Sequence, residues 1–246
     1  MLNSSIQSWD DRRDLIVPGD AEKTILFAVE HWVHSAKRSI QQRGRFTVAL
    51  SGGSTPKAIY QALSKEKEIE WDKIWLFWSD ERGVPPDHPD SNFRMAMENG
   101  FKALPIPKAQ IFRMPADLEL HQAARSYEEI LRHHLDKEFF DLVMLGMGDD
   151  GHTASLFPNT PALKIEDRLV AAQYLTDKKS NRLTLTFPCI NQSRHMAIYA
   201  IGAKKAPMVH TVLEAPIISP YPASRVGTPD HKALWILDHN AAANIK

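Results

Sequence analysis

The chain has 246 residues, enough for one large α/β domain with a sizeable core. The 30 Lys and Arg residues balance the 30 Asp and Glu residues, so no overall charge points to nucleic acid or a membrane surface as a partner. The single cysteine, Cys189, excludes an internal disulfide framework and a cysteine-only metal site.

The first residues, MLNSSIQSWDDRRD, lack the apolar core of a signal peptide, and no stretch is long enough to span a membrane. We therefore expect a cytoplasmic protein with no membrane or nucleic-acid partner. The sequence leaves the oligomeric state open, with a monomer the simpler expectation. Cys189 follows a proline at the end of an apolar run, which favours a buried structural thiol.

The first predicted element is a helix between Asp20 and Gly44. Asp20 is suited to cap its start, its apolar residues form one stripe, and Gly44 lies just beyond its end. Two further helical stripes run from Leu120 to His134 and onward from Pro207.

Six short apolar runs, rich in β-branched or aromatic residues, predict strands. They are Phe46–Leu50, Ile74–Trp78, Leu142–Leu145, Leu183–Phe187, Met196–Ile201 and Leu234–Leu237. Their near-continuous hydrophobicity is typical of strands covered on both faces. Strands that alternate with helices predict a parallel, doubly wound α/β sheet, and no repeat or linker divides residues 1–246, so we expect one domain. In such sheets ligands bind outside the carboxyl ends of the strands.

The first of three polar strand ends reads Ser51-Gly52-Gly53-Ser54-Thr55, and a helix follows it at once. Thr55 is suited to be the N-cap, with Pro56 as the first helical residue. The glycines allow close approach of a ligand, and the free N–H groups at a helix start favour an anion. A phosphate site and a plain glycine-containing turn both fit this segment alone.

The second strand end reads Ser79-Asp80-Glu81-Arg82. If these residues point into the crevice, Arg82 is suited to bind phosphate or carboxylate, and Asp80 to accept from a sugar hydroxyl or to move a proton. The alternative is three ordinary solvated charges.

The third strand end reads Gly146-Met147-Gly148-Asp149-Asp150-Gly151-His152. Its glycines predict a tight turn that places Asp150 beside His152, an arrangement suited to a general base. A hydrogen-bonded structural histidine is the alternative. A metal site has less support, because neither a second motif histidine nor HExxH spacing is present.

Together, VALSGGSTPKAIY, WSDERGVPPDHPDSNFRMA and LVMLGMGDDGHTASLFP closely resemble the 6-phosphogluconolactonase family, in its short cytosolic type. That type is similar in fold to glucosamine-6-phosphate deaminase. The resemblance implies a three-layer α/β/α, Rossmann-like fold and no required metal or organic cofactor. It also implies hydrolysis of 6-phospho-D-glucono-1,5-lactone to 6-phosphogluconate, the second step of the oxidative pentose phosphate pathway.

The resemblance also implies roles for particular residues. The Ser51–Thr55 loop matches the phosphate-side loop of the family, with Arg182 and Lys205 as phosphate partners. His152 matches the general base that activates water, and Asp150 or a backbone carbonyl would hold its imidazole. Arg82 matches the arginine of the family's DER motif, and with the loop N–H groups it is a candidate donor to the oxyanion. Residues 160–180 match no strong pattern and yield no candidate.

Two other functions are compatible with parts of the sequence. Amino-sugar deaminases share LG-x-G-x-DGH but carry an acidic residue just before the closing proline, where this chain has Phe157. A non-enzymatic sugar-phosphate-binding domain of a transcription regulator would bring a DNA-binding segment. The residues before the first predicted strand offer one helix and no helix-turn-helix unit.

Overall fold

The computed structural model describes residues 5–135, 137 and 140–245. Six strands of its main sheet are parallel, and a two-residue edge strand, β1, runs antiparallel to them. In spatial order the strands are β1 (Gln7–Ser8), β2 (Arg13–Gly19), β10 (Ala233–Asp238), β9 (Met196–Ala200), β6 (Leu142–Gly146), β3 (Phe46–Leu50) and β4 (Ile74–Trp78).

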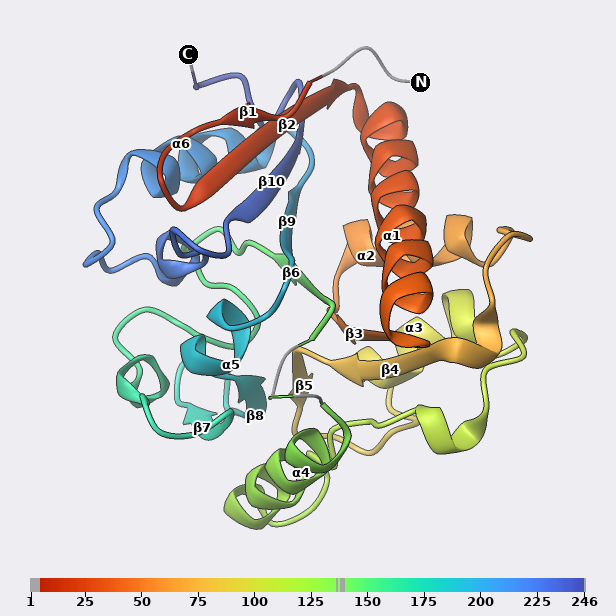
Figure 1. The fold of residues 1–246 in the computed structure, drawn as a ribbon. Helices are drawn as coiled ribbons and strands as arrows, with labels where there is room; N and C mark the ends of the chain where they lie inside the picture. Colours follow the sequence, from red (N-terminus) through yellow and green to blue (C-terminus); the bar gives the residue numbers. More distant parts are fainter. Residues whose placement is uncertain (1–4, 136, 138–139, 246) are drawn as a thin grey trace.

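Helices cover both faces of this sheet, which gives the three-layer α/β/α fold that the sequence predicts. Figure 1 shows α1 (Ala21–Arg43) on one side of the parallel strands and α6 (Ala206–Glu214) on the other. The remaining α-helices are α2 (Ser54–Leu63), α3 (Asn92–Ala96), α4 (Leu120–His134) and α5 (Phe187–Asn191). Short helical turns are η1 (Trp71–Lys73), η2 (Met97–Phe101), η3 (Lys108–Gln110), η5 (Pro161–Lys164), η6 (Ala203–Lys205) and η7 (Pro222–Arg225).

A second, antiparallel sheet of three strands lies beside the main one, in the order β5 (Asp80–Arg82), β8 (Ser180–Leu185) and β7 (Val170–Leu175). The predicted strand over Leu183–Phe187 is therefore wrong in its sheet and in its bounds, because β8 begins at Ser180 and ends at Leu185. The run belongs to the small sheet, and Phe187 opens α5 because Thr186 caps that helix by accepting from the N–H of Cys189.

The other boundaries follow the predictions closely. The bounds of β3, β4 and α4 are those predicted, β6 and β9 differ by one residue at one end, and β10 is longer by one residue at each end. Asp20 caps α1 through the N–H of Lys23, and Gly44 ends it with a φ of 74°. Thr55 is not the N-cap of α2: the helix begins at Ser54, so the cap is Gly53, whose φ is 106°. Strand β2 was not predicted, because only three of its residues, Leu15 to Val17, form an apolar run before Pro18.

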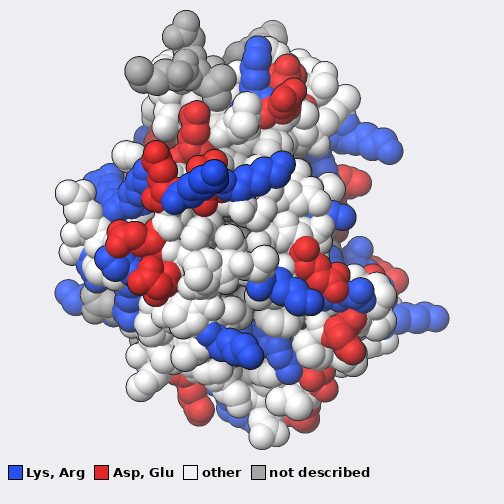
Figure 2. Space-filling model, turned by 90° about the vertical axis from the view of Figure 1, so that its right-hand side faces the viewer, with Lys and Arg blue, Asp and Glu red and all other residues white. Residues whose placement is uncertain are grey.

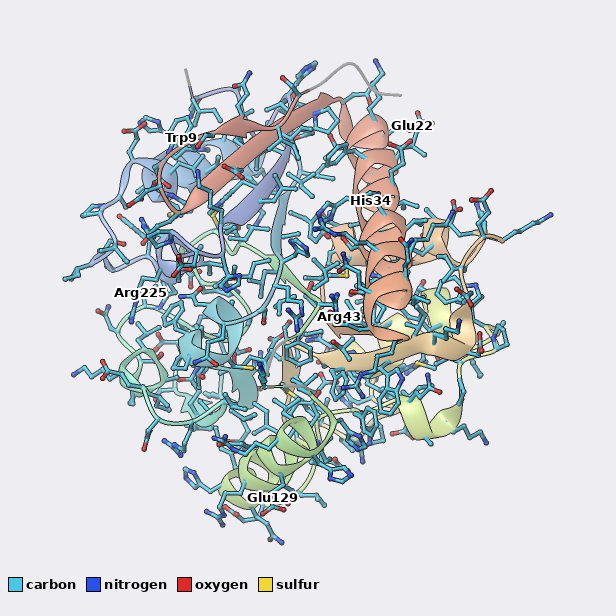
Figure 3. The ribbon with its side chains drawn as sticks, viewed as in Figure 1. Trp9, Glu22, His34, Arg43, Glu129 and Arg225 are labelled. Atoms are coloured by element: carbon cyan, nitrogen blue, oxygen red, sulfur yellow. The ribbon has the colours of Figure 1, made fainter. Side chains whose placement is uncertain are left out.

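Buried polar residues connect distant parts of the chain. Arg13 in β2 donates from Nη1 to the carbonyl of Val212 at 2.9 Å and from Nη2 to that of Leu213 at 2.8 Å. Trp9, labelled in Figure 3, also donates to the Leu213 carbonyl. These bonds satisfy carbonyls at the end of α6 that have no partner within the helix. Strand β2 is thereby fixed to an element about two hundred residues away, which local sequence patterns do not reveal.

Charged side chains of both signs are interspersed over one face of the molecule (Figure 2), as the balanced composition predicts. Cys189 is buried, as expected. Among the described residues, no helix has the length and apolarity needed to cross a membrane.

Asp141 is a buried carboxylate that joins three elements where β6 begins. It accepts from the N–H of Thr47 at 2.8 Å and from Nε of Arg43 at 3.0 Å, and Nε of Arg194 lies 3.4 Å away. Arg43, labelled in Figure 3, is the last residue of α1, and Thr47 lies in β3.

Asp141→Ala should lower the free energy of unfolding by about 3 kcal/mol, because it leaves the buried N–H of Thr47 without an acceptor and takes a counter-charge from Arg43. Urea denaturation measures the loss. Asp230→Ala, at an exposed position, is the control and should change stability by less than about 0.5 kcal/mol. Equal stability of the two variants would contradict the role given to Asp141.

Candidate active site

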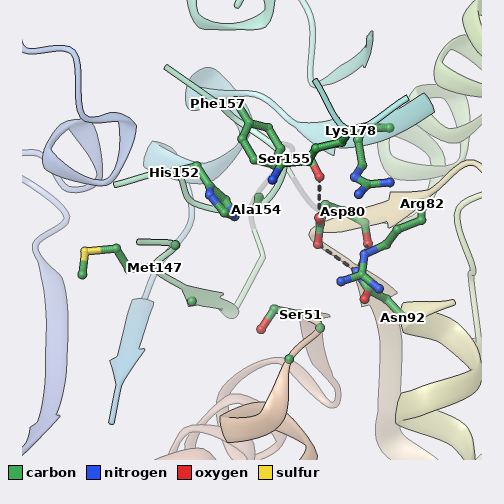
Figure 4. A pocket seen from close by; sticks show the side chains of 15 residues that line it. Ser51, Asp80, Arg82, Asn92, Met147, His152, Ala154, Ser155, Phe157 and Lys178 are labelled. Carbon is green, nitrogen blue, oxygen red and sulfur yellow. Dashed lines mark hydrogen bonds between the residues drawn. The ribbon is translucent and has the colours of Figure 1, made fainter. Parts of the chain in front are cut away.

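A cavity of about 300 Å³ opens at the carboxyl ends of β3 and β6, where it faces the small sheet (Figure 4). Its position agrees with the rule for open α/β sheets. It is lined by Ser51, Gly52, Gly53, Asp80, Arg82, Asn92, Gly146, Met147, Gly148, His152, Ala154, Ser155, Phe157, Lys178 and Arg182. All three strand ends that the sequence singled out therefore meet in one place.

The three charged residues that follow β4, Asp80, Glu81 and Arg82, lie on two different faces of β5. Because successive side chains of a strand alternate between its faces, Asp80 and Arg82 share one face of β5 and line the cavity. Glu81 points the other way and is buried, where its carboxylate accepts from Ser91 Oγ and from the N–H groups of Asn92 and Phe93. Glu81 thus caps the start of α3 and is a structural residue.

Asp80 is 7% exposed, and its carboxylate connects two segments that line the cavity. Its Oδ2 accepts from Ser155 Oγ at 2.6 Å, and its Oδ1 accepts from Asn92 Nδ2 at 3.0 Å, as the dashed lines in Figure 4 show. Asn92 in turn packs so closely on the loop after β3 that a Cβ at Gly52 would lie 1.9 Å from its Oδ1. This contact explains why the loop needs glycine there.

Two arginines stand opposite each other on neighbouring strands. Arg82 of β5 and Arg182 of β8 are direct partners in the antiparallel register, and both line the cavity. Burial lowers the pKa of Arg182, and the charge of Arg82 lowers it further, against the opposing effect of Asp80 and Glu81. Like charges placed directly opposite destabilise a sheet, and an anion between the two guanidinium groups would offset that repulsion.

The loop after β3 adds neutral donors to the same cavity. Ser51 Oγ is buried and has no hydrogen-bond partner within the described structure. No side chain of the described residues caps the start of α2, whose first N–H groups therefore remain available. The cavity wall here suits a phosphate or a carbonyl oxygen.

His152 lies on the far side of Asp80 from Arg82 (Figure 4). Its Nδ1 is 2.5 Å from Oδ1 of Asp150, which also accepts from the backbone N–H of His152 at 3.1 Å. Burial alone would raise the pKa of Asp150, but the hydrogen bonds from His152 outweigh it and lower the pKa below its usual value. Asp150 is thus held ionised beside Nδ1, which leaves Nε2 as the nitrogen that can accept a proton.

The turn after β6 depends on a glycine for this pairing. A Cβ at Gly148 would lie 2.0 Å from Nδ1 of His152 and 2.8 Å from Oδ1 of Asp150. The imidazole therefore occupies the space that any other residue at this position would fill. The predicted juxtaposition of Asp150 and His152 is present, and Gly148 explains it.

Phe157 forms a wall of the cavity between a histidine and a lysine. Its ring stacks on that of His152, with centroids 4.1 Å apart and planes at 28°. Nζ of Lys178 lies 5.3 Å from the centroid of the same ring.

Four predicted site residues do not line this cavity. Ser54 and Thr55 lie in the first turn of α2, and Asp150 touches the site through His152. Nζ of Lys205 lies 2.6 Å from Oδ1 of Asp149 and 3.0 Å from the carbonyl of Met147. Lys205 therefore stands behind the cavity wall, and its role as a phosphate partner stays a prediction.

The sequence reasoning missed three polar side chains that line the cavity: Asn92, Ser155 and Lys178. Lys178 comes from the stretch that offered no pattern. Asn92 and Ser155 could not be found from the DER motif, which carries no sign that the Asp80 carboxylate needs two donors. Within the described part of the chain, no group of three or more His, Cys, Asp and Glu side chains is placed to hold a metal ion.

Comparison with known proteins places the chain among sugar-phosphate enzymes. Residues 19–235 match the family model for glucosamine-6-phosphate isomerases/6-phosphogluconolactonase. A 6-phosphogluconolactonase of Chlamydia muridarum is 39% identical over 236 residues, which cover 95% of this chain and 91% of the relative. A 6-phosphogluconolactonase of Nostoc sp. is 44% identical over 216 residues, with 84% and 88% covered.

Solved structures agree. The crystal structure of 6-phosphogluconolactonase from Thermotoga maritima has a TM-score of 0.81 and 31% identity, covering 91% of this chain and 98% of that one. A monomeric glucosamine-6-phosphate deaminase also has a TM-score of 0.81, at 19% identity, covering 94% and 99% of the two chains. At that identity the second match shows a shared fold alone.

Gly148→Ala should displace the imidazole of His152 while leaving the fold nearly as stable, because a ring on a rotatable side chain moves more easily than backbone. The ring resonances of His152, assigned by their absence in His152→Gln, should shift in histidine NMR spectra. Gly146→Ala is the matched control, since a Cβ there meets no described atom within 4 Å. Unchanged His152 resonances in Gly148→Ala would refute the packing argument.

Proposed function

The chain belongs to the family of glucosamine-6-phosphate isomerases and 6-phosphogluconolactonases, and we propose that it hydrolyses 6-phospho-D-glucono-1,5-lactone to 6-phosphogluconate, the second step of the oxidative pentose phosphate pathway. One observation carries this proposal: a single cavity holds a carboxylate-bound histidine at one side and a pair of facing arginines at the other. A lactone with a phosphate at its far end matches both groups.

The phosphate would lie between the arginine pair and the loop after β3. Arg82 and Arg182 supply charge, and the loop supplies N–H groups at the start of α2. This placement keeps Arg182 and the Ser51–Gly53 part of the phosphate site expected from the sequence. The lactone carbonyl then points toward His152, on the other side of Asp80.

Hydrolysis requires a water activated by a base. Nε2 of His152 takes a proton as the water oxygen attacks C1 of the lactone, and Asp150 stabilises the imidazolium through Nδ1. The unpaired hydroxyl of Ser51 is available to donate to the oxyanion that develops. The C1–O5 bond then breaks, and O5 receives the proton back from His152. The carboxylic acid formed at C1 releases its proton to solvent.

Asp80 contributes position in this scheme. Both of its oxygens already accept hydrogen bonds, from Ser155 and Asn92, so it is poorly placed to move a proton. It fixes the segments that carry those residues. It also lies between Arg82, where the phosphate would bind, and His152, where the lactone carbonyl would lie.

The deaminase reaction is the alternative, and Phe157 argues against it. The deaminases of this fold carry an acidic residue at the corresponding position, where it works with the histidine in ring opening. Here an aromatic ring stacks on His152 instead. A purified preparation should release acid from 6-phosphogluconolactone, and no ammonia from glucosamine 6-phosphate. Ammonia release without lactone hydrolysis would overturn the proposal.

His152→Gln should lower kcat by about 10²- to 10⁴-fold with little change in KM, since general-base catalysis is typically worth that factor. Rates need correction for spontaneous lactone opening. His121→Gln, at an exposed position, is the control. A folded His152→Gln enzyme that keeps more than about a tenth of kcat would show that His152 is not the general base.

Arg182→Ala should raise KM for the phosphorylated lactone more than tenfold, because a charge-assisted hydrogen bond in a partly buried site is worth about 1.5–3 kcal/mol. Activity on unphosphorylated gluconolactone should barely change. Arg125→Ala, which removes an exposed arginine of α4, should affect neither substrate. Equal losses on both substrates would remove Arg182 from the phosphate site.

A further inference from the structure

Lys178 enters the cavity from the turn that joins β7 to β8. We propose that Lys178 is a third phosphate-binding cation, which acts with the arginine pair to make the site selective for a phosphate dianion. The inference rests on the proposed function for the identity of the substrate, but its charge argument concerns any phosphate at this site.

The first argument is charge balance. Of the described residues that line the cavity, three are cations (Arg82, Lys178 and Arg182) and one, Asp80, is a carboxylate. These four side chains sum to two excess positive charges, and a phosphate monoester carries about −1.5 to −2 at pH 7. Without Lys178 the excess is a single charge, which suits a monoanion better than a dianion.

The second argument is position. Figure 4 shows Lys178 extending from the Arg82 side of the cavity toward Phe157. Its Nζ lies over the Phe157 ring at 5.3 Å, a cation–π contact, which is worth only about 0.5–1 kcal/mol at exposed sites. A lysine ammonium sits on a flexible four-carbon stem, so a phosphate at the arginine pair can draw it from the ring at small cost.

The third argument is that Lys178 closes the site on one side. Together with Phe157 it also lines a second cavity of about 580 Å³, which contains Asp150 and Tyr174. The two side chains thus form the partition between the cavities.

The test measures binding, so that it does not depend on turnover. Calorimetry with 6-phosphogluconate and with inorganic phosphate would compare the unsubstituted protein with Lys178→Gln. At pH 7.5 we expect Lys178→Gln to weaken both ligands about tenfold, and Lys178→Arg to restore most of the affinity. A phosphate monoester is mostly a monoanion at pH 5.5, because its second pKa is about 6. At that pH the dissociation constant of 6-phosphogluconate for Lys178→Gln should exceed that for the unsubstituted protein by about threefold or less.

Lys179→Gln is the matched control, because Lys179 is the exposed neighbour in the same turn and does not line the cavity. It should bind both ligands as the unsubstituted protein does. Equal affinity of Lys178→Gln and the unsubstituted protein would overturn the inference, as would a loss that is the same at both pH values. Phosphate binding that depends on Lys178 in a protein that fails to hydrolyse the lactone would overturn the function and leave this inference standing.

Discussion

A buried carboxylate is tolerated only when hydrogen-bond donors reach both of its oxygens, and Asp80 meets that condition through residues from two other segments. Asn92 comes from the start of α3, and Ser155 follows the turn that carries His152. Ser155 is held further by Thr184 and Gln173 of the small sheet. The need to satisfy one carboxylate therefore fixes β5, α3 and the segment after β6 relative to one another, and the cavity is the space between them.

The same cavity contains an unfavourable pairing of like charges, which Asp80 and Glu81 offset only in part. Two arginines face each other across β5 and β8, and burial weakens the solvation that would screen them. A structure selected for stability alone would separate these charges. Their retention beside an uncapped helix start and an unpaired serine hydroxyl is understandable if an anion occupies the site during function. An anion bound there would relieve the repulsion between the two arginines, and that gain would add to its affinity.

On the opposite side of the cavity, close packing fixes the position of His152, the proposed general base. The imidazole of His152 lies in a space that exists because residue 148 has no side chain, with Asp150 on one nitrogen and Phe157 against the ring. Phe157 thus has two effects. It packs against the ring of the histidine, and by the resemblance drawn from the sequence it takes the place of the acidic residue that the deaminases carry.

Much of this protein is determined by local sequence. Hydrophobic runs gave the bounds of β3 and β4, Asp20 and Gly44 gave the ends of α1, and the turn glycines of LGMGDDGH indicated that Asp150 and His152 would meet. These features depend on neighbours a few residues apart. Only the tertiary structure decided the rest. Strand β8 pairs with β5 in the small sheet, so Arg182 faces Arg82. Lys178 lines the cavity, whereas Lys205 bonds Asp149 and does not line it. Each of these depends on strand pairing and packing between segments up to a hundred residues apart, which no short pattern encodes.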